Sequence, residues 1–328
     1  MISTALDKLP TSILDTIGNT PLMRMKRLFL PHDHAIYGKL EAFNPGGSIK
    51  DRTAMQLISH AIHSGELKSG DTVVESSSGN MGIGLAQICN YFNLKLEIVV
   101  DPMVNNQTVQ IMKAYGANIN RVEKPANPGG FLQARLDKVQ EIMRHEKNCF
   151  WTNQYANRQN PEAHLTTMKE IEMALGEAPD FLFAATSTCG TLMGCIQYIQ
   201  EKELPTQVVA VDAMGSVIFG SAPGERKIPG HGASRKSQFL NPELIADVVH
   251  VDDRDCVRGC RKLLDRESLL CGGSSGAVVA ALENYLPLIP NDSTIAMILC
   301  DRGERYLDTI YNDEWVEREL YQEKALAL

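Results

Sequence analysis

Long apolar runs are missing from this sequence of 328 residues. No stretch reaches the roughly 18 uninterrupted apolar residues that suggest a membrane-spanning helix, and the segment from Met1 to Pro10 lacks the apolar centre of a secretory signal peptide. The net charge of −8 is opposite in sign to a nucleic-acid-binding surface. We therefore expect a cytoplasmic protein whose partners include neither a membrane nor a nucleic acid.

The spacings typical of metal and nucleotide sites are missing as well. None of the eight cysteines forms a CxxC pair, and none of the eight histidines belongs to an HExxH pattern. Cys256 and Cys260 lie one helical turn apart, but no histidine follows at zinc-finger spacing. Neither a Walker A motif nor a GxGxxG loop is found. The sequence therefore predicts reduced cysteines and no metal site, and it gives little support to nucleotide binding.

What the sequence has is a repeated order of apolar run, small-residue turn and helical pattern. Strand candidates lie at 72–75, 96–101, 117–123, 181–185, 207–213, 248–251 and 294–299, and helical spacing lies at 82–92, 105–115, 130–145 and 192–201. The strand candidates are rich in β-branched residues and do not alternate with polar ones, which predicts strands covered on both faces. Strands that alternate with helices form mainly parallel sheets. We expect two three-layer α/β domains with a cleft between them.

Three glycine-containing turns each precede a helical pattern. They are Ser187–Thr191 (STCGT), Glu75–Gly82 (ESSSGNMG) and Asn44–Arg52 (NPGGSIKDR). Backbone N–H groups and the helix dipole favour a phosphate or carboxylate at such turns, but the same residue types also make ordinary helix caps. The third turn places Lys50 at the start of a helix, where a cation is unfavourable. A Schiff-base lysine and a solvated lysine both remain open for this position.

Five motifs stand in one order along the chain: IGNTPL from Ile17, NPGGSIKDR from Asn44, SSGNMG from Ser77, STCGT from Ser187 and CGGSSG from Cys271. In this order they resemble the fold-type II pyridoxal-phosphate enzymes, the family of cysteine synthases, cystathionine β-synthases and threonine synthases. The resemblance covers nearly the whole chain. It implies pyridoxal 5′-phosphate as cofactor and small amino acids as substrates.

The resemblance also assigns roles to residues. It implies that Lys50 forms the Schiff base and acts in catalysis, that Asn80 contacts the cofactor's ring hydroxyl, and that Ser274 faces its pyridine nitrogen. It implies a phosphate cradle of Ser187, Thr188, Cys189, Gly190 and Thr191, and an α-carboxylate site of Ser77, Ser78 and Gln154. It further implies a homodimer, a smaller mobile substrate-carboxylate domain over 43–155, and a larger phosphate-binding domain over 11–42 and 156–320.

Within the family, NQYAN, GSVIFG, PGHGASR and DRGERYLDTIY look like the enzymes that join O-phospho-L-serine to L-glutamate. Their product is N-(2-amino-2-carboxyethyl)-L-glutamate, a precursor of L-2,3-diaminopropionate in siderophore biosynthesis. This likeness makes Arg135, Tyr155 and Ser187 candidates for recognising phosphoserine or the second amino acid, and Arg302 is a further cationic candidate.

Three other functions stay open. A cysteine synthase would share every cofactor residue, a dehydratase would need no nucleophile, and a catalytically silent binding module would keep only the fold. Two departures mark this chain, because cysteine synthases usually have GTGGT and TSGNT where it has STCGT and SSGNM.

Overall fold

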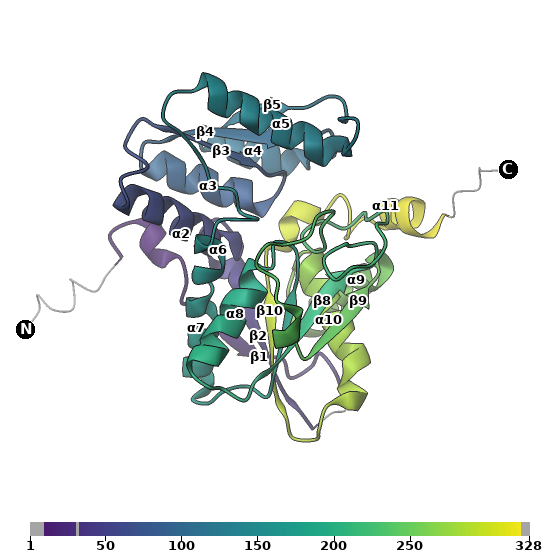
Figure 1. The fold of residues 1–328 in the computed structure, drawn as a ribbon. Helices are drawn as coiled ribbons and strands as arrows, with labels where there is room; N and C mark the ends of the chain where they lie inside the picture. Colours follow the sequence, from purple (N-terminus) through teal and green to yellow (C-terminus); the bar gives the residue numbers. More distant parts are fainter. Residues whose placement is uncertain (1–9, 31–32, 323–328) are drawn as a thin grey trace, which may run out of the picture.

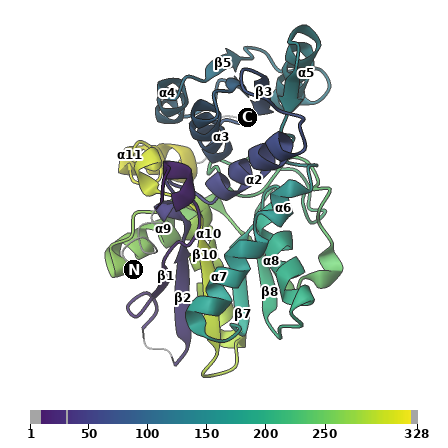
Figure 2. The same cartoon turned by 90° about the vertical axis from the view of Figure 1, so that its left-hand side faces the viewer.

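The computed structural model describes residues 10–30 and 33–322, which form two α/β units (Figure 1). Their strands belong to a six-stranded sheet and a four-stranded sheet. Figure 2 shows the two units from the side, with helix α2 (Lys50–His63) lying between the smaller sheet and the larger unit. The structure confirms the expected two-domain α/β fold with mainly parallel sheets.

The larger sheet has the strand order β1-β2-β10-β7-β8-β9. All neighbours run parallel except β1, which pairs antiparallel with β2 at the edge. The strands are β1 (Leu22–Arg24), β2 (Ala35–Leu40), β10 (Thr294–Leu299), β7 (Phe181–Ala185), β8 (Gln207–Ala213) and β9 (Asp247–Val251).

Both faces of this sheet are covered. Along β7, Phe181 and Phe183 belong to the core shared with α9 (Asp253–Glu267) and α10 (Gly273–Tyr285). Leu182 and Ala184 belong to the opposite core, shared with α7 (Leu165–Leu175) and α8 (Gly190–Glu201). Because successive strand residues point to opposite faces, a strand buried on both sides is apolar throughout.

The smaller sheet has the order β5-β4-β3-β6, and all its strands are parallel. They are β3 (Thr72–Ser76), β4 (Lys95–Val100), β5 (Asn118–Arg121) and β6 (Cys149–Trp151). One face packs against α2, α3 (Asn80–Tyr91) and α4 (Asn106–Ala114), and the other packs against α5 (Gly130–His145). This unit is therefore also three-layered.

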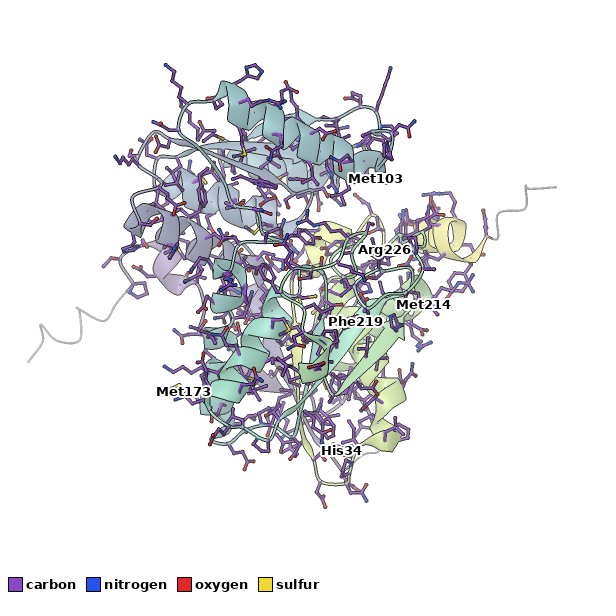
Figure 3. The ribbon with its side chains drawn as sticks, in the orientation of Figure 1. His34, Met103, Met173, Met214, Phe219 and Arg226 are labelled. Atoms are coloured by element: carbon purple, nitrogen blue, oxygen red, sulfur yellow. The ribbon has the colours of Figure 1, made fainter. Side chains whose placement is uncertain are left out.

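Two short helices, α6 (Gln159–Glu162) and α11 (Asp313–Val316), complete the labelled elements. The connection from β8 to β9 is long, and Figure 3 labels Met214, Phe219 and Arg226 along it. Among residues 10–30 and 33–322, no helix is long and apolar enough to cross a membrane.

The strands of the smaller sheet fall within 72–151, and those of the larger sheet fall within 22–40 and 181–299. The boundaries at 43 and 155 remain predictions, as does the mobility of the smaller unit.

Candidate active site

A cavity of about 270 Å³ lies where the two units meet. Its lining comes from both of them, through α2, the turns after β3 and β6, the turn after β7, and the start of α10. With the exception of Arg302, the candidate residues named from the sequence all line this cavity: Lys50, Ser77, Ser78, Asn80, Arg135, Gln154, Tyr155, Ser187, Thr188, Cys189, Gly190, Thr191 and Ser274.

Helix N-termini converge on this cavity. Lys50 is the first residue of α2, Asn80 of α3 and Gly190 of α8, while Ser274 is the second residue of α10. Two of these helices follow the carboxyl ends of the parallel strands β3 and β7, where α/β proteins place their ligands. The positive ends of the dipoles and the free N–H groups of each first turn favour a ligand with several anionic groups.

Lys50 is half-buried in the wall of this cavity. Burial lowers the pKa of its ammonium group, and Cys300, Cys189 and Asp301 oppose this shift only in part. In the described part of the chain, no carboxylate lies within ion-pair distance of its Nζ. The location therefore favours the neutral amine, which is the nucleophilic and basic form.

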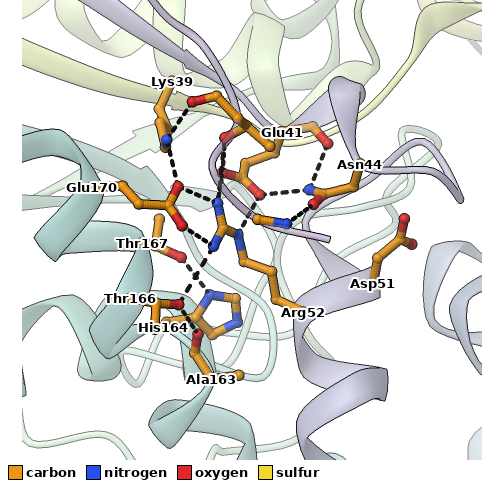
Figure 4. A network of polar contacts seen from close by, with 12 residues as sticks. Lys39, Glu41, Asn44, Asp51, Arg52, Ala163, His164, Thr166, Thr167 and Glu170 are labelled. Atoms are coloured by element: carbon orange, nitrogen blue, oxygen red, sulfur yellow. Dashed lines mark hydrogen bonds and ion pairs between the residues drawn. The ribbon is translucent and has the colours of Figure 1, made fainter. Parts of the chain in front are cut away.

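A buried charge network fixes the helix that carries Lys50 (Figure 4). Arg52 donates to both carboxylate oxygens of Glu41, at 2.7 and 2.9 Å, and to both oxygens of Glu170, at 2.7 Å each. Lys39 adds a second cation 2.6 Å from Glu170. Burial acts to raise the pKa of Glu170, but hydrogen bonds from Arg52 and Lys39 outweigh it and lower that pKa to about 2. The start of α2 is thereby tied to β2 and α7.

Helix α6 contacts the turn Ser187–Thr191 and fixes its position. Asn160 of this helix donates to the hydroxyl of Thr188 at 3.0 Å and to the carbonyl of Gln154 at 2.7 Å. A Cβ atom on Gly190 would lie 2.1 Å from the Asn160 side chain, so only glycine fits here. Cys189 has a left-handed φ of 62°. The turn is thus compact and lies at a helix N-terminus, in spite of its unusual cysteine, while its role as a phosphate cradle stays a prediction.

The opposite wall is made by the turn after β3. The hydroxyl of Ser77 accepts hydrogen bonds from the N–H groups of Gly82, at 3.1 Å, and Gly79, at 3.4 Å, so it satisfies N–H groups at the start of α3. Ser78 and Gln154 line the cavity beside it. Behind them, buried Glu75 accepts from Thr152 at 2.5 Å and from the N–H of Gln154 at 3.2 Å. Glu75 thereby fixes the segment that carries Gln154.

Asn80 lies in a polar network that the sequence did not predict. Its amide donates to Asp301 at 2.7 Å, and its oxygen accepts from Arg305, which also donates to the carbonyl of Gly46. Tyr306 donates to the same Asp301 oxygen at 2.5 Å. The amide keeps a second N–H and its oxygen a second lone pair, so Asn80 can contact a ligand without losing either partner. The cue in the sequence was DRGERY, a charged turn directly after the buried strand β10.

The candidates for anion recognition have different surroundings. Arg135 lines the cavity, with its Nη1 3.4 Å from Asp101 and its buried Nε without a hydrogen-bond partner in the described chain. Tyr155 lines the same cavity. Arg302 does not belong to the lining, and its Nε donates to the carbonyl of Ala42 at 2.8 Å. Of the two arginines considered from the sequence, only Arg135 is in the cavity.

Other lining residues were not predicted as site residues. They include Cys300, at the end of β10, and Arg235, in the connection between β8 and β9. Arg235 lies within PGHGASR, a motif that the sequence analysis used only for the resemblance. Nothing in the sequence alone places that loop against the turn at 187–191.

The cavity fits pyridoxal 5′-phosphate. Residues 187–191 offer N–H and hydroxyl groups for a phosphate, Lys50 offers an amine whose pKa is lowered by burial, and Ser274 offers a neutral hydroxyl at the base. Gly230 has a φ of +99°, and its Cβ position lies 3.7 Å from Ser274. The loop at 229–230 therefore approaches Ser274 closely.

Solved structures of similar proteins cover nearly the whole chain. An O-ureido-L-serine synthase, in a lysine-to-alanine mutant bound to O-ureido-L-serine, is 29% identical over 96% of both chains, with a TM-score of 0.86. An O-acetylserine dependent cystathionine β-synthase from Helicobacter pylori is 31% identical over 93% of this chain and 99% of its own, with a TM-score of 0.85.

An O-acetyl serine sulfhydrylase isoform 3 from Entamoeba histolytica is 32% identical over 93% of this chain and 92% of its own, with a TM-score of 0.83. Residues 13–301 match the family of pyridoxal-phosphate dependent enzymes. The chain belongs to this family, and pyridoxal 5′-phosphate is its cofactor.

Proposed function

We propose that this enzyme catalyses β-replacement on a serine-derived amino acid, joining O-phospho-L-serine to the amine of L-glutamate. The products are N-(2-amino-2-carboxyethyl)-L-glutamate, a precursor of L-2,3-diaminopropionate, and phosphate. The observation that carries the proposal is the position of Lys50, a half-buried amine with a lowered pKa among helix N-termini suited to anions. The names of the similar structures, which include O-ureido-L-serine and O-acetylserine, support a serine-derived substrate.

When bound, the cofactor supplies the electron sink that makes the Cα–H bond of the substrate acidic. In this proposal the residues at 187–191 hold its phosphate, Asn80 its ring hydroxyl and Ser274 its ring nitrogen. Ser77, Ser78 and Gln154 hold the α-carboxylate of the substrate, with Glu75 fixing the backbone of Gln154. These contacts set the Cα–H bond within reach of Lys50.

The neutral amine of Lys50 removes the proton from Cα. The Cβ–O bond then breaks, and phosphate leaves with its electron pair. The nitrogen of glutamate forms the new bond to Cβ and gives up one proton, which the departing phosphate or water accepts. Lys50 returns its proton to Cα. No electrons are gained or lost overall, so no oxidant or reductant is required.

The two substrates together carry a phosphate and an extra carboxylate, and both need cationic contacts. Arg135, with its unpartnered Nε, is the candidate from the smaller unit. The hydroxyls of Tyr155 and Ser187 are further candidates. We also propose that residues 43–155 close over the bound substrate and exclude water, and that the enzyme is a homodimer.

The test is product identity. Purified holoenzyme is incubated with O-phospho-L-serine and either L-glutamate or sulfide, while phosphate release and product mass are followed. We expect phosphate release that depends on glutamate, together with the mass of the joined product. Lys50→Ala is the matched negative control. Product formation with sulfide alone would instead assign the chain to the cysteine synthases, an alternative favoured by the named O-acetyl serine sulfhydrylase.

A further inference from the structure

The guanidinium of Arg235 lies over the ring of Tyr155 at the cavity. The Cζ atom of its guanidinium is 3.9 Å from the ring centroid, and both residues line the cavity. Tyr155 follows β6 of the smaller sheet, whereas Arg235 comes from the connection between β8 and β9 of the larger sheet. The stacked pair therefore spans the two units.

The backbone around Arg235 is anchored on both sides. The N–H of Gly232 donates to the carbonyl of Thr186 at 2.6 Å, and the hydroxyl of Ser237 donates to the carbonyl of Thr188 at 2.6 Å. The turn that precedes and includes the phosphate cradle thus holds the loop that carries Arg235. A cation fixed in this way keeps its position relative to a ligand in the cradle.

The guanidinium of Arg235 has no anionic partner in residues 10–30 and 33–322. None of the hydrogen bonds or ion pairs of that part of the chain uses its side chain, whereas Arg135 faces Asp101 at 3.4 Å. Stacking fixes the guanidinium plane and occupies its face, but leaves the N–H groups at its edge unused. A planar fork of donors is suited to bidentate binding of a carboxylate or phosphate.

We propose that Arg235, oriented by Tyr155, binds the side-chain oxyanion of an amino-acid substrate in this cavity. That oxyanion is the phosphate of the donor or the side-chain carboxylate of the acceptor. The inference rests on the proposed function in assuming a substrate of this class. It adds a specificity residue on the larger unit, opposite Arg135.

The donor arm of the test measures binding. Four holoenzymes are titrated with O-phospho-L-serine and with O-acetyl-L-serine: wild type, R235Q, R235K and the control K236Q. Lys236 is an exposed neighbouring cation outside the cavity lining. The absorbance change of the bound cofactor gives the dissociation constant. If the phosphate is the ligand, R235Q weakens O-phospho-L-serine binding at least about tenfold and leaves O-acetyl-L-serine binding unchanged. R235K recovers part of the loss, because it keeps the charge without the fork.

The acceptor arm starts from enzyme already reacted with donor. L-Glutamate or sulfide is added, and the rate at which the starting spectrum returns is measured against acceptor concentration. If the carboxylate is the ligand, R235Q raises the glutamate concentration needed for half-maximal rate at least about tenfold, without changing the response to sulfide. R235Q values within about twofold of K236Q in both arms would overturn the proposal. Wild-type enzyme that responds to neither donor would contradict the proposed function instead.

Tyr155 provides a second, independent comparison. Y155F keeps the ring beneath the guanidinium, and Y155L removes it. We expect Y155L to reproduce the selective loss seen in R235Q, and Y155F, which lacks only the hydroxyl, to lose less of the discrimination between charged and uncharged substrates than Y155L. Equal losses for charged and uncharged substrates in Y155L would indicate a purely structural ring and overturn the orienting role of Tyr155.

Discussion

Arg52 and Glu170 are joined by two parallel hydrogen bonds, Nη1 to Oε1 and Nη2 to Oε2, each 2.7 Å long. They lie on α2 and α7, so the pair connects the helix that begins at Lys50 to a helix packed on the larger sheet. Glu41 takes the remaining edge of the same guanidinium, and Lys39 balances the charge (Figure 4). Two buried cations thus share buried Glu41 and partly buried Glu170, and Arg52 lies two residues from Lys50.

We predict that Glu170→Ala destabilises the protein by about 3–5 kcal/mol, because it leaves Arg52 and Lys39 buried with only one carboxylate. Denaturant unfolding measures the loss. Glu177→Gln is the control, since Glu177 is an exposed acidic residue just after the same helix. A change in unfolding free energy for Glu170→Ala no larger than that of the control would contradict the importance of the network.

The same carboxylate predicts a dependence of stability on pH. The pKa of Glu170 is lowered to about 2 from the ordinary 4.5, mainly by hydrogen bonds from Arg52 acting against burial. A lowered pKa means that the native state holds fewer protons than the unfolded state. The stabilisation from Glu170 is therefore complete above about pH 4.5 and is lost as the pH falls toward 2. The stability difference between wild type and Glu170→Gln should shrink across this interval and stay constant between pH 6 and pH 8.

Much of the fold follows from the sequence, because its central strands are apolar throughout and bounded by turns. The strands expected at 181–185, 207–213 and 294–299 agree with β7, β8 and β10, and the helix expected at 130–145 agrees with α5. The edge strands β1 and β6 have three residues each, which is too short for a periodic signal. Helix α10 is buried on every side at its start, so its sequence shows no polar face.

The site was less accessible from the sequence than the fold. The turns at 75–82 and 187–191 predicted anion sites, because each places small residues directly before a helix. Lys50 could be selected only through the family resemblance, because burial and neighbouring charge are properties of the folded chain. Long-range contacts, such as the hydrogen bond between Asn80 and Asp301, bring Arg235, Arg305 and Asp301 to the site. No local pattern encodes these contacts.

We predict that Lys50→Met removes the visible absorbance of the bound cofactor and also makes the cofactor-free protein more stable. Burial lowers the pKa of Lys50 below the ordinary 10.5, so the Lys50 amine binds a proton more weakly in the native state than in the unfolded state. This destabilisation is small near pH 10.5 and grows as the pH falls. Melting temperatures of the cofactor-free proteins at pH 7 and pH 10 check it. If Lys50→Met raised the melting temperature more at pH 10 than at pH 7, the result would contradict a lowered pKa of Lys50.

Gly190→Ala tests the cradle directly. The new Cβ atom would lie 2.1 Å from Oδ1 of Asn160, so α6 and the first turn of α8 have to separate. Asn160 then loses its place beside Thr188 and Gln154, and the N–H groups at 187–191 no longer converge. We expect cofactor affinity to fall at least about tenfold, since each charge-assisted contact to a phosphate contributes about 1.5–3 kcal/mol.

Gly194→Ala is the matched control for this variant, because its Cβ atom would meet the carbonyl of Pro161 at 2.1 Å, one turn further along the same contact between α6 and α8. Both variants should lose stability through overpacking, by about 1–3 kcal/mol. Only Gly190→Ala changes a residue of the cradle itself, so only this variant should need a large excess of pyridoxal 5′-phosphate to regain the bound-cofactor spectrum. Equal cofactor affinities in the two variants would mean that the loss arises from helix packing, and that the turn at 187–191 does not hold the phosphate.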